Sequence, residues 1–275
     1  MRRILVFLSI LSAGLSASLF ASSARAEVVL LVHGYLGDAL TWERSGVNET
    51  LAANGWQRAG IIVPGIRGPL LPPPIAAAPN EVYAVELPST APLAIQSDIV
   101  IRALRALEAR HPSEHITLVG HSAGGVVARM AVVRGGIGQV TRLVTIASPN
   151  LGTERALEAL DATHGGGPFG AIRNAFGGRT YRVVKRSWPV LVDLAPVVPG
   201  STLHWLNVQN HPDIQYVSIV RGAAYGLGDE LVPGFSQDMN NVPKLRGKVR
   251  TYVVPAEHSL VPPDGTLLAQ VLAGR

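Results

Sequence analysis

The chain contains no cysteine. It therefore has no disulfide bond, no thiolate nucleophile, no cysteine-ligated metal site and no cysteine to which a lipid anchor could be attached. Its stability has to come from a hydrophobic core, and residues 27–275 are long enough to bury one. Because this stretch shows neither an internal repeat nor a dividing linker, we expect a single domain over residues 27–275.

Charge of one sign is also scarce. The 275 residues carry a net charge of +5 at pH 7, and removing Arg2, Arg3 and Arg25 leaves +2 for residues 27–275. The lysines and arginines are scattered, and no basic run alternates with aromatic side chains, as stacking on nucleic-acid bases requires. These absences exclude nucleic acid as a partner.

The sequence has one long apolar run, and it lies at the N-terminus. Arg2 and Arg3 precede the run from Ile4 to Phe20, and Ala24-Arg25-Ala26 follows it. This order is typical of a signal peptide, so we expect residues 1–26 to be removed and the protein to be exported, to the periplasm or beyond. The alternative is a membrane anchor, but the run is short for a bilayer span and a small-x-small cleavage site follows it directly.

Apolar runs alternate with helix-like segments along residues 27–275. Ile95, Ile99, Ala103 and Leu107 recur at helical spacing, which predicts an amphipathic helix. Strands and helices that alternate in this way form an α/β fold, with a mostly parallel sheet and helices on both faces. Reactive groups of such a fold lie beyond the carboxyl ends of the strands. The predicted strands are Val28–Val32, Val82–Leu87, Ile116–Val119, Leu143–Ile146, Tyr216–Val220 and Thr251–Val254.

Two segments interrupt this alternation. The stretch from Pro64 to Pro92 contains eight prolines. Proline excludes helix and central strand over much of this stretch, so we predict a surface loop. The stretch from Leu151 to Pro212 lies between two predicted strands and is too long for a plain connection.

The motif Gly120-His121-Ser122-Ala123-Gly124 lies between a predicted strand and a predicted helix. Gly-x-Ser-x-Gly is a weak signal by itself, and its position at a sharp strand-to-helix turn is what gives it weight. Such a turn strains the serine backbone and needs flanking glycines, because side chains there would clash with the neighbouring strand and helix. We therefore predict that Ser122 is a nucleophile and that the backbone N–H of Ala123 is directed at a developing oxyanion.

A second glycine-bearing loop, His33-Gly34-Tyr35-Leu36-Gly37, follows the first predicted strand. In a fold with a nucleophile of this kind, that loop supplies the other oxyanion donor. We assign this role to the backbone N–H of Tyr35 or Leu36, with Tyr35 preferred. The side chain of His33 either braces the loop or is a buried core histidine.

A nucleophilic serine needs a histidine base, and the histidine needs a carboxylate that fixes its tautomer. His258 lies in the loop directly after the last predicted strand, so we predict that it is the base. The glycine-rich loop after Tyr216–Val220 carries Asp229, the predicted acid, and the adjacent Glu230 is the alternative. The order Ser122, Asp229, His258 is that of α/β hydrolases and differs from two other known orders of serine triads.

Five motifs together make the chain resemble bacterial lipases and esterases of the α/β-hydrolase superfamily, from about Glu27 to the C-terminus. It is particularly similar to a branch of lipases in which a Pro-His-Leu-Gly segment follows the strand after the nucleophile; the corresponding residues here are Pro149–Gly152. It also resembles minimal members of the superfamily that lack the first two strands of the fold. Asn150 departs from that Pro-His-Leu-Gly pattern, so no role is carried over to it. The motifs are His33-Gly34-Tyr35, Gly120–Gly124, Ser148–Thr153, Gly228–Pro233 and Glu257-His258.

The resemblance implies an α/β-hydrolase fold in which residues 151–212 form a cap or lid. Apolar residues around Trp188 and Trp205 either line an acyl pocket or only pack this segment onto the core. No cofactor is implied. No residues match the calcium sites of the family, so we assign no metal ligand.

These features predict a serine hydrolase of carboxylic esters with apolar acyl chains, a lipase or carboxylesterase. Its expected partner is a small-molecule or lipid ester, with at most transient contact with a lipid interface, and the sequence leaves the oligomeric state open. An amidase or peptidase on the same triad and a catalytically inactive lipid- or protein-binding homologue are the alternatives. An inactive homologue predicts a lost triad residue, and all three candidates are present.

Overall fold

The computed structural model describes residues 26–75, 80–164, 179–222 and 229–274, so the predicted signal peptide lies almost entirely outside the described residues. The strands of the described part form one sheet in the order β3-β2-β4-β1-β5-β6-β7-β8. All neighbouring pairs are parallel except β2 and β3. The strands are β1 (Glu27–Val32), β2 (Gln57–Gly65), β3 (Gly68–Leu70), β4 (Asn80–Val85), β5 (His115–His121), β6 (Val140–Ile146), β7 (Gln215–Gly222) and β8 (Val249–Pro255).

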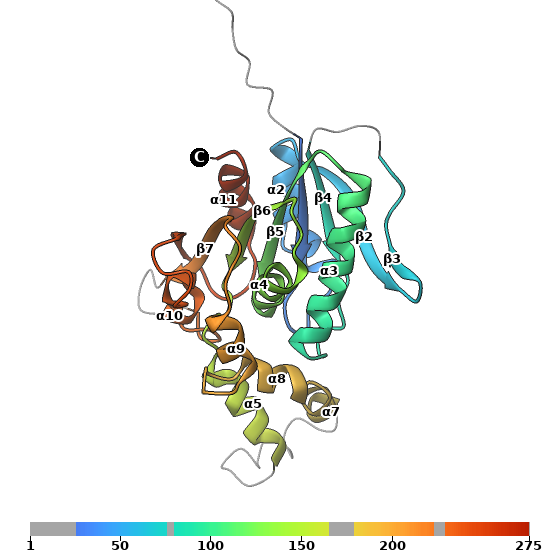
Figure 1. The fold of residues 1–275 in the computed structure, drawn as a ribbon. Helices are drawn as coiled ribbons and strands as arrows, with labels where there is room; N and C mark the ends of the chain where they lie inside the picture. Colours follow the sequence, from blue (N-terminus) through green and yellow to red (C-terminus); the bar gives the residue numbers. More distant parts are fainter. Residues whose placement is uncertain (1–25, 76–79, 165–178, 223–228, 275) are drawn as a thin grey trace, which may run out of the picture.

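Helices cover both faces of this sheet (Figure 1). Helices α3 and α4 pack on one face, and α2 and α11 pack on the other. This arrangement confirms the predicted fold class. The helices are α1 (Thr41–Arg44), α2 (Val47–Ala53), α3 (Leu93–Arg110), α4 (Ala123–Gly135), α5 (Glu154–His164), α7 (Arg179–Arg186), α8 (Trp188–Leu194), α9 (Thr202–Val208), α10 (Gly234–Gln237) and α11 (Pro262–Leu272), with a short 3₁₀ helix over Met239–Asn241.

The central strand β1 shows why the sequence specifies this architecture. Leu30 and Val32 belong to the core beneath α3 and α4, whereas Val29 and Leu31 belong to the core beneath α2 and α11. Successive side chains of a strand point to opposite faces, so a strand that is covered on both sides is apolar throughout. The run Val28–Val32 is accordingly buried at every position.

Helices α5, α7, α8 and α9 lie between β6 and β7 in the sequence, within the segment that the sequence marked as irregular. In Figure 1 they form a group below the sheet, at the end toward which β1 runs. This group therefore lies at the carboxyl ends of the parallel strands, where α/β folds place their reactive groups.

The prediction of a surface loop over residues 64–92 is wrong in part. Gly65 ends β2, and Gly68–Leu70 forms the antiparallel strand β3 at the edge of the sheet. Pro64 lies opposite Pro69 in this hairpin. Pro69 lies in the edge strand β3, whose outer N–H positions need no partner, and Pro64 lies beyond Ile62, the last residue of β2 that pairs with β4.

One residue of the predicted helix faces the other way. Ile95 belongs to α3, but half of its surface is exposed (51%). The buried side of the first turns is formed instead by Leu93, Gln96 and Ser97. The predicted helical spacing holds for Ile99, Ala103 and Leu107, which are buried.

Candidate active site

Ser122 occupies the turn between β5 and α4. Its φ of 53° and ψ of −131° fall in a region that residues other than glycine rarely adopt. The turn is held on both sides, because the Ser122 amide donates to the Ile146 carbonyl (2.9 Å) and its carbonyl accepts from the Gly125 amide (3.0 Å). Strained backbone of this kind persists only where the surroundings fix it, and it is concentrated at functional sites.

Close packing explains the glycines on either side of Ser122. A Cβ atom on Gly120 would lie 2.4 Å from the Cα atom of Gly125, and one on Gly124 would lie 2.3 Å from the His33 carbonyl oxygen. Both distances are far inside van der Waals contact. A side chain at either position would push α4 away from β5 or from the end of β1, so the turn requires glycine at both.

Two side chains from distant parts of the chain extend a line of hydrogen bonds from the Ser122 hydroxyl. The Nε2 atom of His258 lies 2.8 Å from the Oγ atom of Ser122, and the Nδ1 atom of His258 lies 2.6 Å from the Oδ2 atom of Asp229. His258 follows β8, and Asp229 lies in the stretch between β7 and α10. The residues chosen from the sequence as nucleophile, base and acid thus form one hydrogen-bonded chain.

The Asp229 carboxylate is completely buried and has four donors. Its Oδ1 atom accepts from the amides of Leu231 (2.8 Å) and Val232 (2.9 Å), and its Oδ2 atom accepts from His258 and from the Nε2 atom of Gln237 (3.0 Å). Burial raises the pKa of Asp229, but the hydrogen bond and charge of His258 and the two amides outweigh burial, so the net pKa lies below its ordinary value. Asp229 is therefore held as a carboxylate.

The lowered pKa of Asp229 predicts a pH-dependent stability. Its charged form stabilises the folded state above the ordinary pKa of 3.8, and this contribution is lost as the pH falls through the lower pKa of the folded state. We expect the wild type to exceed Asp229→Asn in unfolding free energy near neutral pH, and this excess to shrink below about pH 4. Urea unfolding of both proteins across this range measures it. A difference that stays constant down to about pH 3 contradicts the lowered pKa.

The alternative acid, Glu230, does not reach His258. Its side chain is exposed, and among the described residues its carbonyl oxygen contacts Arg155 instead. The glycine-rich stretch before Asp229, residues 223–228, lies outside the described residues.

The loop after β1 lies directly beside Ser122. A Cβ atom on Gly34 would lie 2.8 Å from the Cβ atom and 3.4 Å from the Oγ atom of Ser122. The loop turns back at once, because the Gly37 amide donates to the Gly34 carbonyl (3.1 Å) and Leu36 has a positive φ of 56°. Within the described residues, the amides of Tyr35 and Leu36 donate to no protein acceptor. Both remain candidates for the second oxyanion donor.

The Ala123 amide is the other candidate donor. Ala123 is the first residue of α4, and the first amides of a helix have no acceptor within that helix. It also lies at the positive end of the helix dipole. The site thus offers free amides next to a serine hydroxyl, which is the arrangement that stabilises a tetrahedral oxyanion.

The contact between Gly34 and Ser122 gives a direct test of this geometry. A methyl group in Gly34→Ala has to displace the loop or the serine, and a misplacement of about 1 Å costs on the order of 100-fold in rate. We therefore expect kcat to fall by about 100-fold. Steady-state kinetics of the purified variant measure it, with Gly138→Ala as control, since a Cβ atom on Gly138 meets nothing within 4 Å. Full activity of Gly34→Ala means that the loop does not approach Ser122 this closely.

Two buried histidines brace the site without meeting Ser122. His33 accepts from the Leu87 amide through Nε2 (3.1 Å) and contacts the Gly34 carbonyl through Nδ1 (3.1 Å), so it braces the loop after β1. His121 donates through Nε2 to the His258 carbonyl (2.9 Å). Burial lowers the pKa of His33, and burial followed by the charge of His258 lowers the pKa of His121 to about 4. Both are therefore neutral structural histidines.

The sequence did not point to a buried ion pair behind His258. The guanidinium of Arg221 binds both carboxylate oxygens of Asp264, at 2.6 and 2.7 Å, and both side chains are fully buried. Arg221 also donates to the Ser259 carbonyl (3.1 Å), and Asp264 accepts from the Val261 amide (2.9 Å). The pair therefore fixes the loop that carries His258. Arg221 and Asp264 lie 43 positions apart in the sequence, so no local sequence motif indicates that they pair.

Asn150, to which the sequence assigned no role, is also structural. It is fully buried, and its side-chain amide donates to the carbonyls of Ser148 (3.2 Å) and Gln237 (3.1 Å). Its own carbonyl accepts from Asn207 in α9 (3.2 Å). Asn150 therefore links the end of β6 to the segments around Asp229 and α9.

Comparison with known proteins agrees with the fold. A family model described as a PGAP1-like alpha/beta domain matches residues 93–162, about a quarter of the chain. Among solved structures, the mature lipase BlEst2 of Bacillus licheniformis is 15% identical, with a TM-score of 0.61 and 92% of each chain covered. An extracellular alpha/beta-hydrolase from a Paenibacillus species is 13% identical, with a TM-score of 0.50, and the match covers 90% of this chain and 98% of that one. The chain has the α/β-hydrolase fold.

A third structural neighbour shares the α/β-hydrolase fold at similar distance. The RedJ thioesterase of the prodiginine pathway in Streptomyces coelicolor is 16% identical, with a TM-score of 0.54, and the match covers 92% of this chain and 87% of that one. A search of curated proteins found no match to the sequence. The comparisons thus confirm the expected α/β-hydrolase fold.

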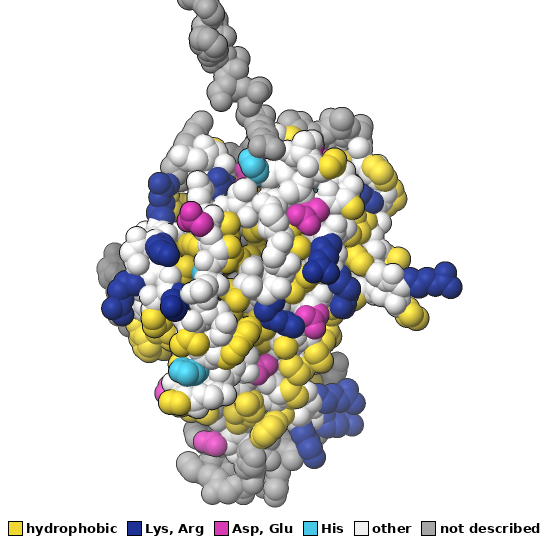
Figure 2. Space-filling view, in the orientation of Figure 1, with side chains coloured by type: hydrophobic (Ala, Val, Ile, Leu, Met, Phe, Trp, Pro, Cys, Tyr) yellow, Lys and Arg dark blue, Asp and Glu magenta, His cyan; other side chains and the backbone are white. Residues whose placement is uncertain are grey.

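The end of the α/β-hydrolase sheet that carries Ser122 is flanked by apolar side chains. Tyr35 is half-buried in the loop after β1, close to Ser187 just before α8, and burial raises the pKa of Tyr35. Hydrophobic side chains gather over the lower part of the molecule, where α8 and α9 lie (Figure 2). Those with more than two fifths of their surface exposed are Trp188, Val192, Val198, Trp205 and Val208.

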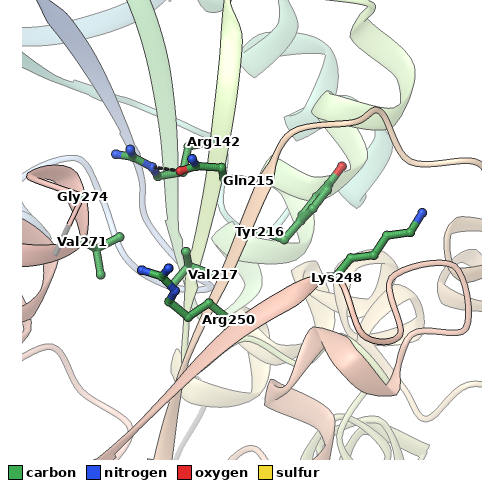
Figure 3. Close-up of a pocket in the computed structure, with 8 residues that line it drawn as sticks. All are labelled: Arg142, Gln215, Tyr216, Val217, Lys248, Arg250, Val271 and Gly274. Carbon is green, nitrogen blue, oxygen red and sulfur yellow. Dashed lines mark hydrogen bonds between the residues drawn. The ribbon is translucent and has the colours of Figure 1, made fainter.

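A pocket of about 270 Å³ lies at the other end of the sheet (Figure 3). Arg142, Gln215 and Arg250 line it, and they belong to the first residues of β6, β7 and β8. Ser122 follows the last residue of β5, and these strands are parallel. The pocket and Ser122 therefore lie at opposite ends of the strands. The pocket is therefore not part of the site around Ser122, and its Arg142 is paired with Glu27 at the start of β1 (3.1 Å).

No group of three or more histidine, aspartate or glutamate side chains in the described residues could hold a metal ion. None of the helices in the described part of the chain combines the length and hydrophobicity that crossing a bilayer requires.

Proposed function

We propose that this protein is a serine hydrolase that cleaves carboxylic esters of apolar acyl chains through an acyl-enzyme on Ser122. One observation carries the proposal: Ser122, His258 and Asp229 are joined by hydrogen bonds of 2.8 and 2.6 Å at a strained turn. A serine hydroxyl is a poor nucleophile unless a base accepts its proton, and this chain supplies the base and the group that orients it.

The proposed reaction has two halves. His258 accepts the Ser122 proton at Nε2 while the Oγ atom attacks the ester carbonyl, and His258 then donates that proton to the leaving alcohol. In the second half, His258 accepts a proton from a water that attacks the acyl-enzyme, and it returns this proton to the Ser122 Oγ atom as the bond to the acyl group breaks and the acid leaves. Asp229 stabilises the imidazolium in both halves, since it accepts from Nδ1 and stays a carboxylate.

The developing oxyanion would lie between the free amides of Ala123 and of Tyr35 or Leu36. An amide pair of this kind is preorganised, and the loss of one donor costs about 100- to 1,000-fold in rate. No cofactor is needed in this reaction, because the protein supplies the nucleophile, the base and the oxyanion donors.

Apolar esters are the proposed substrates because of the surface that flanks the site. Trp188 and Val192 of α8 and Trp205 of α9 leave more than two fifths of their surface uncovered, at the end of the sheet that carries Ser122. Exposed apolar side chains on the helices at the end of the sheet that carries the nucleophile favour an apolar acyl chain over a charged or peptide substrate. The structural neighbours that are named a lipase and a thioesterase support the same class. We further propose that residues 151–212 act as a cap on this site.

Hydrolysis of p-nitrophenyl butyrate and palmitate by the purified protein tests the proposal. We expect both esters to be cleaved, and Ser122→Ala to lose at least about 10,000-fold in kcat. Ser113→Ala is the matched control, because Ser113 is exposed and precedes β5, at the other end of that strand. Undiminished hydrolysis by folded Ser122→Ala contradicts the mechanism. A folded wild type that is inert to both esters favours the inactive binding homologue.

We also propose that the protein is exported after cleavage close to Ala26, on the sequence pattern alone. N-terminal sequencing of the protein recovered from outside the cytoplasm should begin at about Glu27. Recovery of a chain that still begins at Met1 contradicts export by cleavage.

A further inference from the structure

Gln237 is a buried amide that lies between the end of β7 and the Asp229 carboxylate. Only 1% of its surface is exposed. Its Nε2 atom donates to the Asp229 Oδ2 atom (3.0 Å) and to the Val232 carbonyl (2.7 Å). Its Oε1 atom accepts from the Arg221 amide (2.7 Å). Every polar atom of this side chain is therefore engaged.

The orientation of the Gln237 amide follows from its neighbours. A backbone N–H only donates, so the Arg221 amide requires an oxygen opposite it, and the Val232 carbonyl only accepts, so it requires the NH₂ group. This fixes which end of the amide faces Asp229. The NH₂ group is directed at the same carboxylate oxygen that accepts from His258.

We infer that Gln237 is a positioning residue for the proposed reaction: it holds the Asp229 carboxylate in place and sets how strongly that carboxylate binds the His258 ring. The inference rests on the proposed function for its effect on rate, but its effect on His258 does not. A hydrogen bond donated to a carboxylate spreads the negative charge and lowers the basicity of the shared oxygen.

The other charged and titratable groups around His258 are neutral, paired with each other, or exposed to solvent. The His121 ring lies 5.2 Å from the His258 ring, centroid to centroid, and its lowered pKa keeps it neutral. Arg221 and Asp264 neutralise each other behind the His258 loop. Glu230 and Glu257 lie on the same loops with exposed side chains. Within the described residues, the Asp229 oxygen that faces His258 thus accepts a hydrogen bond from one neutral side chain besides His258, which is Gln237.

Replacement of Gln237 by methionine tests the inference. Methionine keeps the length of the side chain and removes its donor and acceptor. We expect kcat/KM for p-nitrophenyl butyrate to fall by about 10-fold, the size of one lost hydrogen bond to a charged group. We also expect the titration midpoint of His258, followed by NMR of the ring nitrogens, to rise, because a more basic carboxylate holds the imidazolium more strongly.

Gln96→Met is the matched control. Gln96 is equally buried (2% exposed) and donates to the Ala91 carbonyl (2.7 Å), but it lies on α3 and none of its hydrogen bonds reaches the triad. The same substitution there removes a buried hydrogen bond, so it should lower stability and leave the His258 midpoint unchanged. A purely structural role for Gln237 would give the same result as this control.

Gln237→Glu is a second variant that keeps the shape and the acceptor for Arg221. It places a second carboxyl group against Asp229, so the pair shares a proton and gains negative charge as the pH rises. The His258 midpoint should then rise further than in Gln237→Met. This variant provides the measurement if Gln237→Met does not fold.

The outcomes separate the inference from the proposed function. If the His258 midpoint rises in the Gln237 variants but the wild type cleaves no ester, the inference stands and the proposed function is wrong. If the wild type cleaves esters and the Gln237 variants match Gln96→Met in midpoint and kcat/KM, the inference is overturned.

Discussion

Replacement of Asp229 by asparagine should lower kcat by about 10,000-fold in a protein that still folds. Asparagine has one oxygen, and the amides of Leu231 and Val232 are both donors to the inner Oδ1 position. The oxygen has to take that position, so the NH₂ group faces His258. The Nδ1 atom of His258 must then accept, which places its proton on Nε2. That proton faces the Ser122 hydroxyl, so His258 can no longer act as its base.

Steady-state ester hydrolysis by Asp229→Asn measures this effect, and circular dichroism checks the fold. Glu230→Gln is the matched control, since it makes the same change from carboxylate to amide at the adjacent, exposed position. It should keep activity close to that of the wild type. A folded Asp229→Asn variant with more than about a tenth of wild-type kcat contradicts the assignment of Asp229 as the acid.

Replacement of Asp264 by leucine should cost about 3–5 kcal/mol of unfolding free energy. Arg221 would remain as a charge with its side chain fully buried and its carboxylate partner gone. The Val261 amide would also lose its acceptor, so the loop that carries His258 loosens and kcat falls as well. Because single domains are stable by only about 5–15 kcal/mol, this one change removes a large part of the total.

The double variant Arg221→Met/Asp264→Leu separates charge from packing. Apolar side chains of similar size in place of a buried ion pair are often close to neutral in stability, so the double variant should regain most of the loss. Urea unfolding of the wild type, both single variants and the double variant completes the cycle. Additive losses, with the double variant the least stable, contradict a strong pairing of Arg221 with Asp264.

The central strands and the triad were open to prediction from sequence for physical reasons. β1, β5 and β6 are covered on both faces, so their runs are apolar and stand out. The geometry of the turn at Ser122 demands glycine at Gly120 and Gly124, which leaves a readable motif. His258 and Asp229 follow from their places after the last two strands, because parallel strands bring their carboxyl ends to one edge.

Other features leave no such trace. β2 is half-exposed and ends in Pro64-Gly65, so it lacks the apolar run of a central strand. Gln237 reaches Asp229 only because α10 folds back across the end of β7, and a single glutamine eight positions from the acid carries no pattern. The pairing of Arg221 with Asp264 likewise depends on tertiary structure. The residues that support the triad are therefore recognised only in the three-dimensional structure, whereas the triad residues themselves can be recognised from sequence motifs.

Labelling of the wild-type protein with a fluorophosphonate, followed by peptide mass spectrometry, tests most directly whether Ser122 is the nucleophile. A fluorophosphonate reacts with a serine that a neighbouring base activates, so it reports the nucleophile without any choice of ester. We expect one adduct, on Ser122, that disappears in Ser122→Ala and forms far more slowly in His258→Ala. Folded wild-type protein that takes up no label, or takes it up at a different serine, contradicts the assignment of Ser122 as the nucleophile.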